Sequence, residues 1–599
     1  MTLGPRCGKH IRFNLCALCI LLPAFLFAQQ ARQRRAAGAH PYPASSNHAG
    51  PAWFVDVAKD AGLTMQNING EADTKKYIIE TTGSGVGIID YDRDGWPDIF
   101  LVNGKTLDEP TKSPSPPTNH LYRNNHDGTF TDVTIKTGLN ATGWGQGVCV
   151  GDYDNDGYDD LYITYFGENK LYHNQRNGTF KDVSTQAGVA GDGTKWGTGC
   201  AFVDYDRDSK LDLMVANYVQ LDMKTLPKPG EGLMCIWKGT PVMCGPRGLP
   251  YTTNILYHNL GGGRFEDVSK VAGITKTNGH YCFSVSTIDY NQDGWPDIYV
   301  ACDSTPSILY RNNKDASFTD MAPDANAAYD EDGREQAGMG STIGDYDNDG
   351  WLDIFKTNFS DDTASLYHNE KDGTFSPSIS DAGLRLNTQY LGWGTMFLDF
   401  DNSGWLSLLS VNGHVYPEVD SAHLGSNYKE PRLLYQNLGN GKFKDISKDC
   451  GPGCTTPASS RGMATADLWN DGRISAVINN IDSKPMLLVN LASNNNHWLG
   501  ITTRGAPSNR DGIGARVTVF ATNGKKWVQE VRSGSSYISS NDLRLHFGLG
   551  QLTTIDHIHV LWPSRREEDF RVSDVDQFVT LVEGTGAPVG GTTKVTSSH

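Results

Sequence analysis

The 599-residue sequence predicts an all-β fold, in which a seven-bladed β-propeller is followed by a small C-terminal β domain. An acidic motif, DYDRDGWPD at 90–98, occurs in seven copies that begin 52 to 85 residues apart. Each copy is followed by apolar segments of strand length. Repeats of about 50 residues with four strands each are typical of propeller blades.

The first 50 residues are expected to precede the folded protein. Residues 1–28 combine a basic start, an apolar run over 13–27 and a small residue, Ala28. The run is shorter than the roughly 20 residues that span a bilayer, so we favour a secretory signal peptide over a membrane anchor. We expect an exported chain, extracellular, periplasmic or on the cell surface, with no transmembrane segment after cleavage. Residues 29–50 are expected to be a disordered linker.

Each unit of the predicted propeller, 51–493, consists of four short strands. A glycine-rich strand precedes the acidic motif and an apolar strand follows it. The third strand carries an LYxN signature, as in LYRNN at 121–125, and the fourth a phenylalanine, as in GTFTDV at 128–133. Asn-Gly and Asp-Gly turns between the last two strands favour hairpins.

The two ends of the repeat array complement each other. The last unit stops after LLVN at 487–490 and lacks a phenylalanine strand, whereas an extra one, FVDV at 54–57, precedes the first unit. An N-terminal strand that completes the last blade closes the ring and leaves no open sheet edge. The alternative, a linear β-solenoid, predicts no such complementary ends.

The acidic motif has the composition of a cation site. In DxDxDGxxD, side-chain oxygens at positions 1, 3, 5 and 9 and the carbonyl at position 7 can surround a hard cation, while glycine at position 6 permits the turn. Aspartate, asparagine and glycine also favour turns by themselves, but a turn does not require four such residues at fixed offsets. Several carboxylates and a carbonyl suit calcium better than magnesium.

Five copies are complete enough to predict about five structural Ca²⁺ sites, although the third copy has Ser209 in place of glycine. The copies at 399–407 and 467–475 have lost acidic ligands and are expected to be vacant. The expected ligands, with position 7 acting through its carbonyl, are Asp90, Asp92, Asp94, Trp96 and Asp98; Asp152, Asp154, Asp156, Tyr158 and Asp160; Asp204, Asp206, Asp208, Lys210 and Asp212; Asp289, Asn291, Asp293, Trp295 and Asp297; and Asp345, Asp347, Asp349, Trp351 and Asp353.

The charge of the chain fits this interpretation. Five divalent ions change the formal net charge from -17 to about -7, so the acidity belongs largely to the sites. The sequence has no basic stripe, and we therefore expect no nucleic-acid partner.

Eight of the eleven cysteines lie beyond the signal segment, as suits an oxidising compartment. We predict a disulfide between Cys235 and Cys244, which bound a short loop, and a second between Cys450 and Cys454, which flank GPG. The spacing does not indicate a zinc site. The sequence leaves open the pairing of Cys149, Cys200, Cys282 and Cys302.

The repeated DYDxDGxxDI and LYxN motifs resemble the FG-GAP/VCBS repeats of integrin alpha chains and bacterial exported proteins, over residues 54 to about 490. Residues 497 to about 583 resemble the ASPIC/UnbV domain through SNRDGIGARV at 508–517, GSSYISSNDLRLHFGLG at 534–550 and VLWPS at 560–564. Together they are similar to the cartilage acidic protein 1-like family of secreted proteins. The resemblance implies extracellular binding or adhesion.

The region 494–583 itself predicts a small β domain, followed by a disordered tail over 584–599. Two polar segments are candidate ligand contacts: the insert NGHVYP, which we expect to be exposed, and a polar turn for which we favour a structural role. Their residues are Asn412 and His414, and Asn509, Arg510 and Asp511.

The sequence contains no motif that predicts catalysis. It lacks a GxSxG elbow, an HExxH pair and a phosphate-binding loop. We expect a binding or adhesion protein that recognises an extracellular protein or glycan. The alternative is an exported hydrolase, lyase or oxidoreductase that uses a propeller face to act on polysaccharide or another extracellular substrate.

Overall fold

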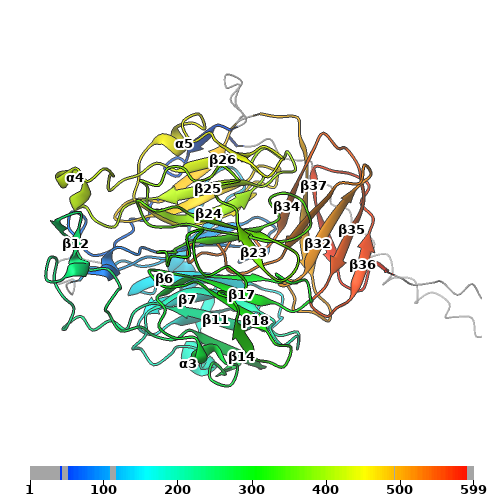
Figure 1. The fold of residues 1–599 in the computed structure, drawn as a ribbon. Coiled ribbons are helices and arrows are strands. Elements are labelled where there is room, and N and C mark those ends of the chain that lie inside the picture. Colours follow the sequence, from blue (N-terminus) through cyan, green and yellow to red (C-terminus); the bar gives the residue numbers. More distant parts are fainter. Residues whose placement is uncertain (1–40, 43–51, 108–115, 492, 590–599) are drawn as a thin grey trace, which may run out of the picture. The chain divides into compact units, whose positions relative to one another are not determined.

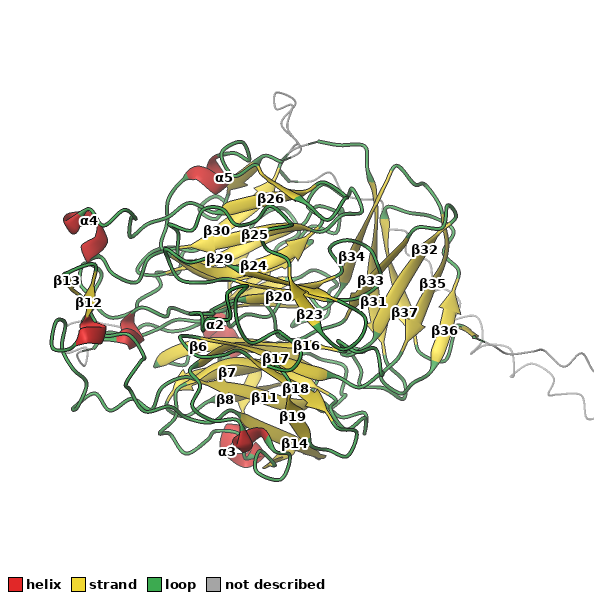
Figure 2. Ribbon diagram, in the orientation of Figure 1, coloured by secondary structure: helices red, strands yellow, loops and turns green. Residues whose placement is uncertain are grey.

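Seven four-stranded antiparallel sheets make up most of the protein (Figures 1 and 2). The computed structural model describes residues 41–42, 52–107, 116–491 and 493–589, all of which belong to one structural unit. The predicted signal peptide, most of the predicted linker and residues 590–599 lie outside the described residues.

The sheets are numbered in chain order, and each is given from its first to its fourth strand. The first contains β2 (Val86–Ile89), β3 (Asp98–Leu101), β4 (His120–Asn124) and β5 (Phe130–Asp132). The second contains β6 (Trp144–Gly151), β7 (Asp160–Phe166), β8 (Lys170–Asn174) and β9 (Phe180–Asp182). The third contains β10 (Gly197–Val203), β11 (Asp212–Asn217), β14 (Ile255–Gly261) and β15 (Arg264–Asp267). The fourth contains β16 (Cys282–Ile288), β17 (Asp297–Cys302), β18 (Ile308–Asn312) and β19 (Phe318–Asp320).

The fifth contains β20 (Ser341–Gly344), β21 (Asp353–Lys356), β22 (Ser365–Asn369) and β23 (Phe375–Pro377). The sixth contains β24 (Gly392–Leu398), β25 (Ser407–Asn412), β26 (Leu433–Asn437) and β27 (Phe443–Asp445). The seventh contains β28 (Ser460–Ala466), β29 (Ser475–Asn480), β30 (Met486–Asn490) and the N-terminal β1 (Phe54–Asp56).

The first strands of these sheets contact one another in a closed cycle, in the order β2, β6, β10, β16, β20, β24, β28 and again β2. The predicted closure is confirmed, because β1 pairs with β30 and Phe54 lies opposite Asn490. A linear solenoid has no contact between its first and last units, so this arrangement excludes it. The predicted all-β propeller fold is confirmed.

The asparagine of the LYxN signature links each sheet to the preceding one. In the second sheet, Asn174 Nδ2 donates to the Tyr91 carbonyl of the first sheet at 2.9 Å. In the first sheet, Asn124 Nδ2 donates to the Leu468 carbonyl of the seventh at 2.9 Å. The equivalent pairs are Asn259 with Tyr153, Asn312 with Tyr205, Asn369 with Tyr290, Asn437 with Tyr346 and Asn490 with Phe400. Seven such bonds complete the ring, each contributing about 1 kcal/mol.

The C-terminal domain is a small β domain, as predicted, and it consists of two sheets. One sheet has the order β34 (Leu545–Gly550), β31 (His497–Arg504) and β37 (Gln577–Val582). The other has the order β33 (Lys526–Glu530), β32 (Arg516–Ala521), β35 (Ile555–Leu561), β36 (Glu567–Phe570) and β38 (Ala587–Pro588).

The predicted disordered tail begins too early. Residues 587–588 form β38, which pairs with β36 through Glu568 and Asp569, so the domain extends beyond 583. A two-residue strand at a sheet edge gives no sequence pattern, and its partner strand alone determines its position.

A segment of the C-terminal domain, residues 533–541, lies along the first strands of the propeller and is called the central segment below. Its Ser540 carbonyl accepts the Ile88 amide of β2, and its Ile538 carbonyl accepts the Val148 amide of β6. Its Ser536 carbonyl accepts the amide of Ser341 in β20 at 3.0 Å. Further bonds to Ser284, Thr395 and Thr465 reach β16, β24 and β28. One short segment that bonds to six first strands of a closed ring lies at its centre.

The remaining elements are short. They are α2 (Thr134–Thr137), α3 (Ser184–Ala187), α4 (Glu418–Ala422), α5 (Pro452–Thr455), the 3₁₀ turns η1 (Ile78–Glu80), η2 (Leu233–Cys235) and η3 (Ile274–Lys276), and a hairpin of β12 (Ile236–Trp237) and β13 (Thr240–Pro241). Among the described residues, no helix has the length and apolar character needed to cross a membrane.

Both predicted disulfides are present, between Cys235 and Cys244 and between Cys450 and Cys454. A third joins Cys282 to Cys302, which lie opposite each other on β16 and β17. Cys149 and Cys200 are buried and free. Strand register places the third pair together, and spacing along the chain does not reveal it.

Candidate metal centres

Each acidic motif forms a loop between the first and second strands of its sheet. In the fifth loop, 345–353, the Asp345 carboxylate accepts the amides of Asp349 and Gly350 at 3.0 and 2.9 Å. Asp349 then accepts the Trp351 amide at 2.8 Å. Gly350 has a φ of +92°, a conformation that glycine adopts without a steric penalty. The first aspartate therefore bends the loop around a centre toward which the other oxygens can turn.

The last aspartate of the loop begins the second strand and also holds the third strand. Asp353 Oδ1 accepts the amide of Asn369, the LYxN asparagine of the same sheet, at 2.9 Å. The same bond occurs in the other four loops predicted to bind calcium, from Asn124 to Asp98, Asn174 to Asp160, Asn259 to Asp212 and Asn312 to Asp297. These aspartates therefore connect the loop to the body of the blade.

Several ligand oxygens of the loops are buried without a hydrogen-bond partner among the described residues. They are Asp92 Oδ1, Asp160 Oδ2, Asp204 Oδ1 and Asp297 Oδ2, one in each of the first four loops. Asp160 and Asp297 are fully buried. A buried carboxylate oxygen without a donor costs several kcal/mol at most sites, and a cation in the loop satisfies it.

The raised pKa values of the loop aspartates also favour a bound cation. Burial, followed by repulsion from Asp353, raises the pKa of Asp345 to about 8. Burial and repulsion from Asp212 raise the pKa of Asp204 to about 8 as well. Desolvation and like charge disfavour the ionised form, and a divalent ion in the loop reverses both effects. Oxygen donors with this spacing fit calcium chemistry, and groups of acidic residues able to hold a metal occur at these loops.

The third strand supplies a basic group that the sequence interpretation missed. His368 Nδ1 lies 3.5 Å from Asp347 and 3.2 Å from Asp353. His173 and His258 occupy the same place in the second and third loops. In the first loop, Arg123 pairs with Asp92 at 2.6 Å. In the sequence, the variable position x of LYxN, which holds His, Arg or Gln, could have indicated this basic group.

The two loops expected to be vacant keep the shape of the others. In the sixth loop Asp399 accepts the amides of Ser403 and Gly404 at 2.9 and 2.7 Å. Ser407 Oγ replaces the last carboxylate and accepts the Asn437 amide at 3.1 Å. The sixth loop thus retains the strand contact but keeps only the Asp399 and Asp401 carboxylates at its ligand positions, so vacancy remains the prediction.

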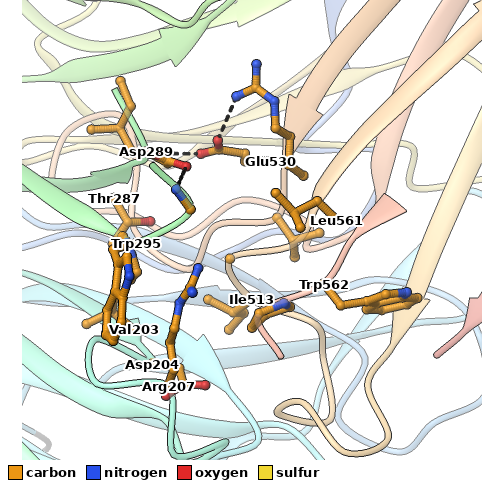
Figure 3. A pocket seen from close by; sticks show the side chains of 17 residues that line it. Val203, Asp204, Arg207, Thr287, Asp289, Trp295, Ile513, Glu530, Leu561 and Trp562 are labelled. Atoms are coloured by element: carbon orange, nitrogen blue, oxygen red, sulfur yellow. Dashed lines mark hydrogen bonds and ion pairs between the residues drawn. The ribbon is translucent and has the colours of Figure 1, made fainter. Parts of the chain in front are cut away.

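The C-terminal domain lies against the acidic loops. Arg516 donates to the Gly350 carbonyl at 2.6 Å, and Trp527 Nε1 donates to the Gly404 carbonyl at 2.9 Å. In Figure 3, Glu530 of this domain lies beside Asp289 of the fourth loop, and Trp562 lines the same pocket as Asp204 of the third loop. Glu530 accepts the Asp289 amide at 3.4 Å. This face of the propeller is therefore an interface between domains.

The polar turn at 509–511 belongs to this interface. Asp511 accepts the Asp152 amide at 2.8 Å, and the Arg510 amide donates to Asn155 Oδ1 at 2.7 Å. The Asn509 side chain bonds both the amide and the carbonyl of Ile513 at 2.8 Å. The contacts of all three residues favour the structural interpretation of this turn.

The insert with His414 is not exposed, contrary to expectation. His414 is fully buried, its Nδ1 accepts the Tyr416 amide at 3.1 Å, and its Nε2 lies 3.1 Å from Ser360 Oγ. Burial, with Arg461 nearby, lowers its pKa to about 3, so the ring is neutral. Asn412 is also buried and donates to the Pro431 carbonyl at 2.6 Å. Segments distant along the chain cover the insert, and the local sequence does not predict this.

Comparison with protein families agrees with these features. A model described as "FG-GAP-like repeat" matches residues 90–163, 152–215, 245–300, 289–356 and 345–410. A model described as "ASPIC and UnbV" matches residues 505–588, including β38. The chain is an FG-GAP repeat protein with a C-terminal ASPIC and UnbV domain.

Two curated relatives are homologous to part of this FG-GAP and ASPIC/UnbV chain. Cartilage acidic protein 1 of Homo sapiens is 24% identical over 312 residues, covering 50% of this chain and 43% of the relative. The protein of the same name from Mus musculus is 27% identical over 215 residues, covering 35% and 29%. The matched region spans less than half of the relatives' own length.

Solved structures with a similar arrangement have low identity. An Agrocybe aegerita lectin that recognises non-reducing terminal N-acetylglucosamine has a TM-score of 0.37 at 15% identity, covering 74% of this chain and 98% of its own. YCF48 bound to a D1 peptide has a TM-score of 0.38 at 7% identity, covering 76% and 97%.

Proposed function

We propose that this chain is an exported, calcium-stabilised propeller that binds an extracellular protein or glycan and does not catalyse a reaction. The observation that supports calcium most directly is the set of buried ligand oxygens without a donor, one in each of the first four acidic loops. The ion in each loop is held by the carboxylates or amide at positions 1, 3, 5 and 9 and the carbonyl at position 7.

Calcium in these loops acts on stability. The last carboxylate of each loop is bonded to the third strand, and the LYxN asparagine of that strand is bonded to the preceding sheet. An ion that fixes Asp160 therefore also fixes Asn174 and, through it, the junction of two blades. Binding to the folded state alone stabilises it through ligand linkage.

Export is supported by the cysteine pairing. Three disulfides occur in the described part of the chain, and such bonds persist in oxidising compartments. The predicted signal peptide over 1–28 agrees with this assignment.

We do not place the ligand site on the acidic face, because the C-terminal domain covers this face through contacts such as Arg516 with Gly350 and Asp511 with Asp152. We assign ligand binding to the opposite face, where the loops after the second strands lie. Propellers use such loop faces for recognition because a rigid ring positions several loops together.

The test has two arms. The first compares thermal unfolding in calcium and in EDTA, and we expect the metal-free protein to unfold at lower temperature and calcium to restore it. Identical unfolding in both buffers overturns the calcium assignment. The second arm exposes the full chain to arrays of glycans and extracellular matrix proteins, alongside polysaccharide hydrolase, lyase and oxidase assays. Turnover that persists through repeated purification overturns the assignment as a binding protein.

A further inference from the structure

A cavity of about 390 Å³ opens on the propeller face away from the acidic loops. Its lining includes Tyr218 and Asp303, which directly follow the second strands β11 and β17, and Phe359, which lies three residues after the end of β21. The acidic loops precede these same strands, so the cavity lies at their other ends. Figure 1 shows the β12 hairpin on this side of the blades and the C-terminal sheets β32, β35 and β36 on the other.

One wall of the cavity is aromatic. The Trp237 ring contacts the rings of Phe359 and Tyr416, with centroids 5.2 and 6.1 Å apart, and Phe359 lies 6.2 Å from Tyr416. His414 packs behind these three rings and fixes their positions. Trp237 and Phe359 are only half-buried, so ring surface remains open to a ligand.

The charge of the cavity is negative. Asp303 is 9% exposed and accepts hydrogen bonds from the hydroxyls of Tyr218 and Ser304. Glu335 and Asp362 also line the cavity, and Arg247 is the one basic residue in the lining, 3.5 Å from Glu335. The lining thus holds three carboxylates and one guanidinium, while Lys238, outside the lining, pairs with Asp361 at 2.6 Å and places its Nζ 5.6 Å from the centroid of the Trp237 ring. Burial raises the pKa of Asp303, while the Tyr218 and Ser304 hydroxyls and Arg247 act in the opposite direction and offset only part of this effect.

The mouth of the cavity is apolar. Leu233 and Met234, directly before the Cys235–Cys244 disulfide loop, and Ile236 within it lie along the rim. Leu233 is 90% exposed, and Met234 and Ile236 are each 44% exposed. Exposed apolar side chains gathered at the entrance to a cavity suit contact with the apolar part of a ligand.

We propose that this cavity binds an organic ammonium ion that carries an apolar body. The ammonium group lies between the Asp303 carboxylate and the rings of Trp237 and Tyr416, where ion pairing and cation–π attraction act together. The apolar body contacts Leu233 and Met234. The assignment rests on the proposed binding function and names its ligand class. The negative charge of this lining repels an anion, and a neutral sugar does not compensate the charge of the lining.

The chemistry fits either a lysine side chain of a protein partner or a small quaternary ammonium compound of the choline type, so the experiment includes both. Calorimetric titrations of the full chain in calcium use benzyltrimethylammonium, choline, an acetylated Ala-Lys-Ala amide and 3,3-dimethylbutan-1-ol, the neutral isostere of choline. We expect the cations to bind and the neutral isostere to bind about ten-fold more weakly or not at all. Stronger binding of the lysine peptide than of choline identifies a protein source, and the reverse identifies a small quaternary ammonium compound.

Two variants test the site. Asp303→Asn keeps an oxygen that can accept the Tyr218 hydroxyl but removes the charge, and we expect it to weaken cation binding about ten-fold. The matched control is Asp381→Asn, the same change at an exposed residue outside the cavity lining, which leaves affinity unchanged. Trp237→Ala serves as a second variant and weakens binding through loss of the aromatic wall.

The outcomes separate this inference from the proposed function. Equal binding of the cation and its neutral isostere, or full affinity in Asp303→Asn, overturns the inference. A glycan that binds the wild-type chain and Asp303→Asn equally also overturns it while the proposed binding function stands. Failure of every array ligand and every cation overturns both.

Discussion

Replacing Asp160 by asparagine separates the two roles of the acidic loops. Asp160 Oδ1 accepts the Asn174 amide at 2.7 Å, and an asparagine oxygen can accept the same bond. Asp160 Oδ2 is fully buried and has no donor among the described residues, so its negative charge is available to the proposed cation. Asp160→Asn therefore keeps the strand contact and removes one ligand charge.

The size of the effect follows from ligand linkage. A site at a calcium concentration one hundred times its Kd contributes about 2.7 kcal/mol to the folded state. With an unfolding entropy of about 2.1 cal/mol/K per residue, a chain of this length loses about 2 °C of apparent Tm when one such site is lost.

The assay is calorimetric unfolding of wild type and variant, each in calcium and in EDTA. We expect Asp160→Asn to lower Tm in calcium and to leave it nearly unchanged in EDTA, since the strand bond survives. The control is Asp401→Asn in the sixth loop, which we expect to be vacant, and it shows no calcium-dependent loss. An equal loss for Asp160→Asn in both buffers contradicts a role of this carboxylate in calcium binding, because the carboxylate then acts through packing alone.

Three further changes test other parts of the structure. Ser209 has a φ of +72° where six loops have glycine, so Ser209→Gly raises the free energy of unfolding by about 0.5 to 1 kcal/mol, measured by urea denaturation. Tyr537 in the central segment is fully buried, and its hydroxyl donates to the Thr82 carbonyl at 3.0 Å. Tyr537→Ala therefore lowers the free energy of unfolding by about 3 to 5 kcal/mol, and Tyr537→Phe lowers it by about 1 kcal/mol. Equal losses for the two variants contradict this packing. Burial raises the pKa of Glu430 from 4.5 to about 8, so the folded state binds the extra proton and stability falls as pH rises between these values. Glu430→Gln removes this pH dependence, which urea titrations at pH 5 and pH 8 measure, and an unchanged slope contradicts it.

Local patterns predicted the blades because each blade is built from residues close in sequence. The acidic motif, the LYxN strand and the phenylalanine strand fall within about 50 residues and pair as hairpins. The closure by β1 was predictable as well, because the seventh unit lacks the strand that Phe54 supplies. The acidic loops formed as expected because Asp345 and its equivalents bond amides only four and five residues away.

Features that depend on contacts across the chain were not predictable. The central segment is one loop of the C-terminal domain, and only the closed ring places Ser536 beside Ser341. The role of the LYxN asparagine depends on a carbonyl in another sheet, as for Asn124 and Leu468, 344 residues apart. His414 looked exposed because its insert is polar and glycine-bearing, yet Trp237 and Phe359 from other sheets cover it.

The number of calcium ions bound per chain is the most direct test of the proposed calcium sites. The full chain is equilibrated by dialysis against buffered calcium, and the bound metal is measured by mass spectrometry against protein concentration. We expect five calcium ions per chain, one for each loop with a complete set of ligands, and four for Asp160→Asn. A chain that binds no calcium, or one that binds seven ions without regard to the lost carboxylates of the sixth and seventh loops, contradicts it.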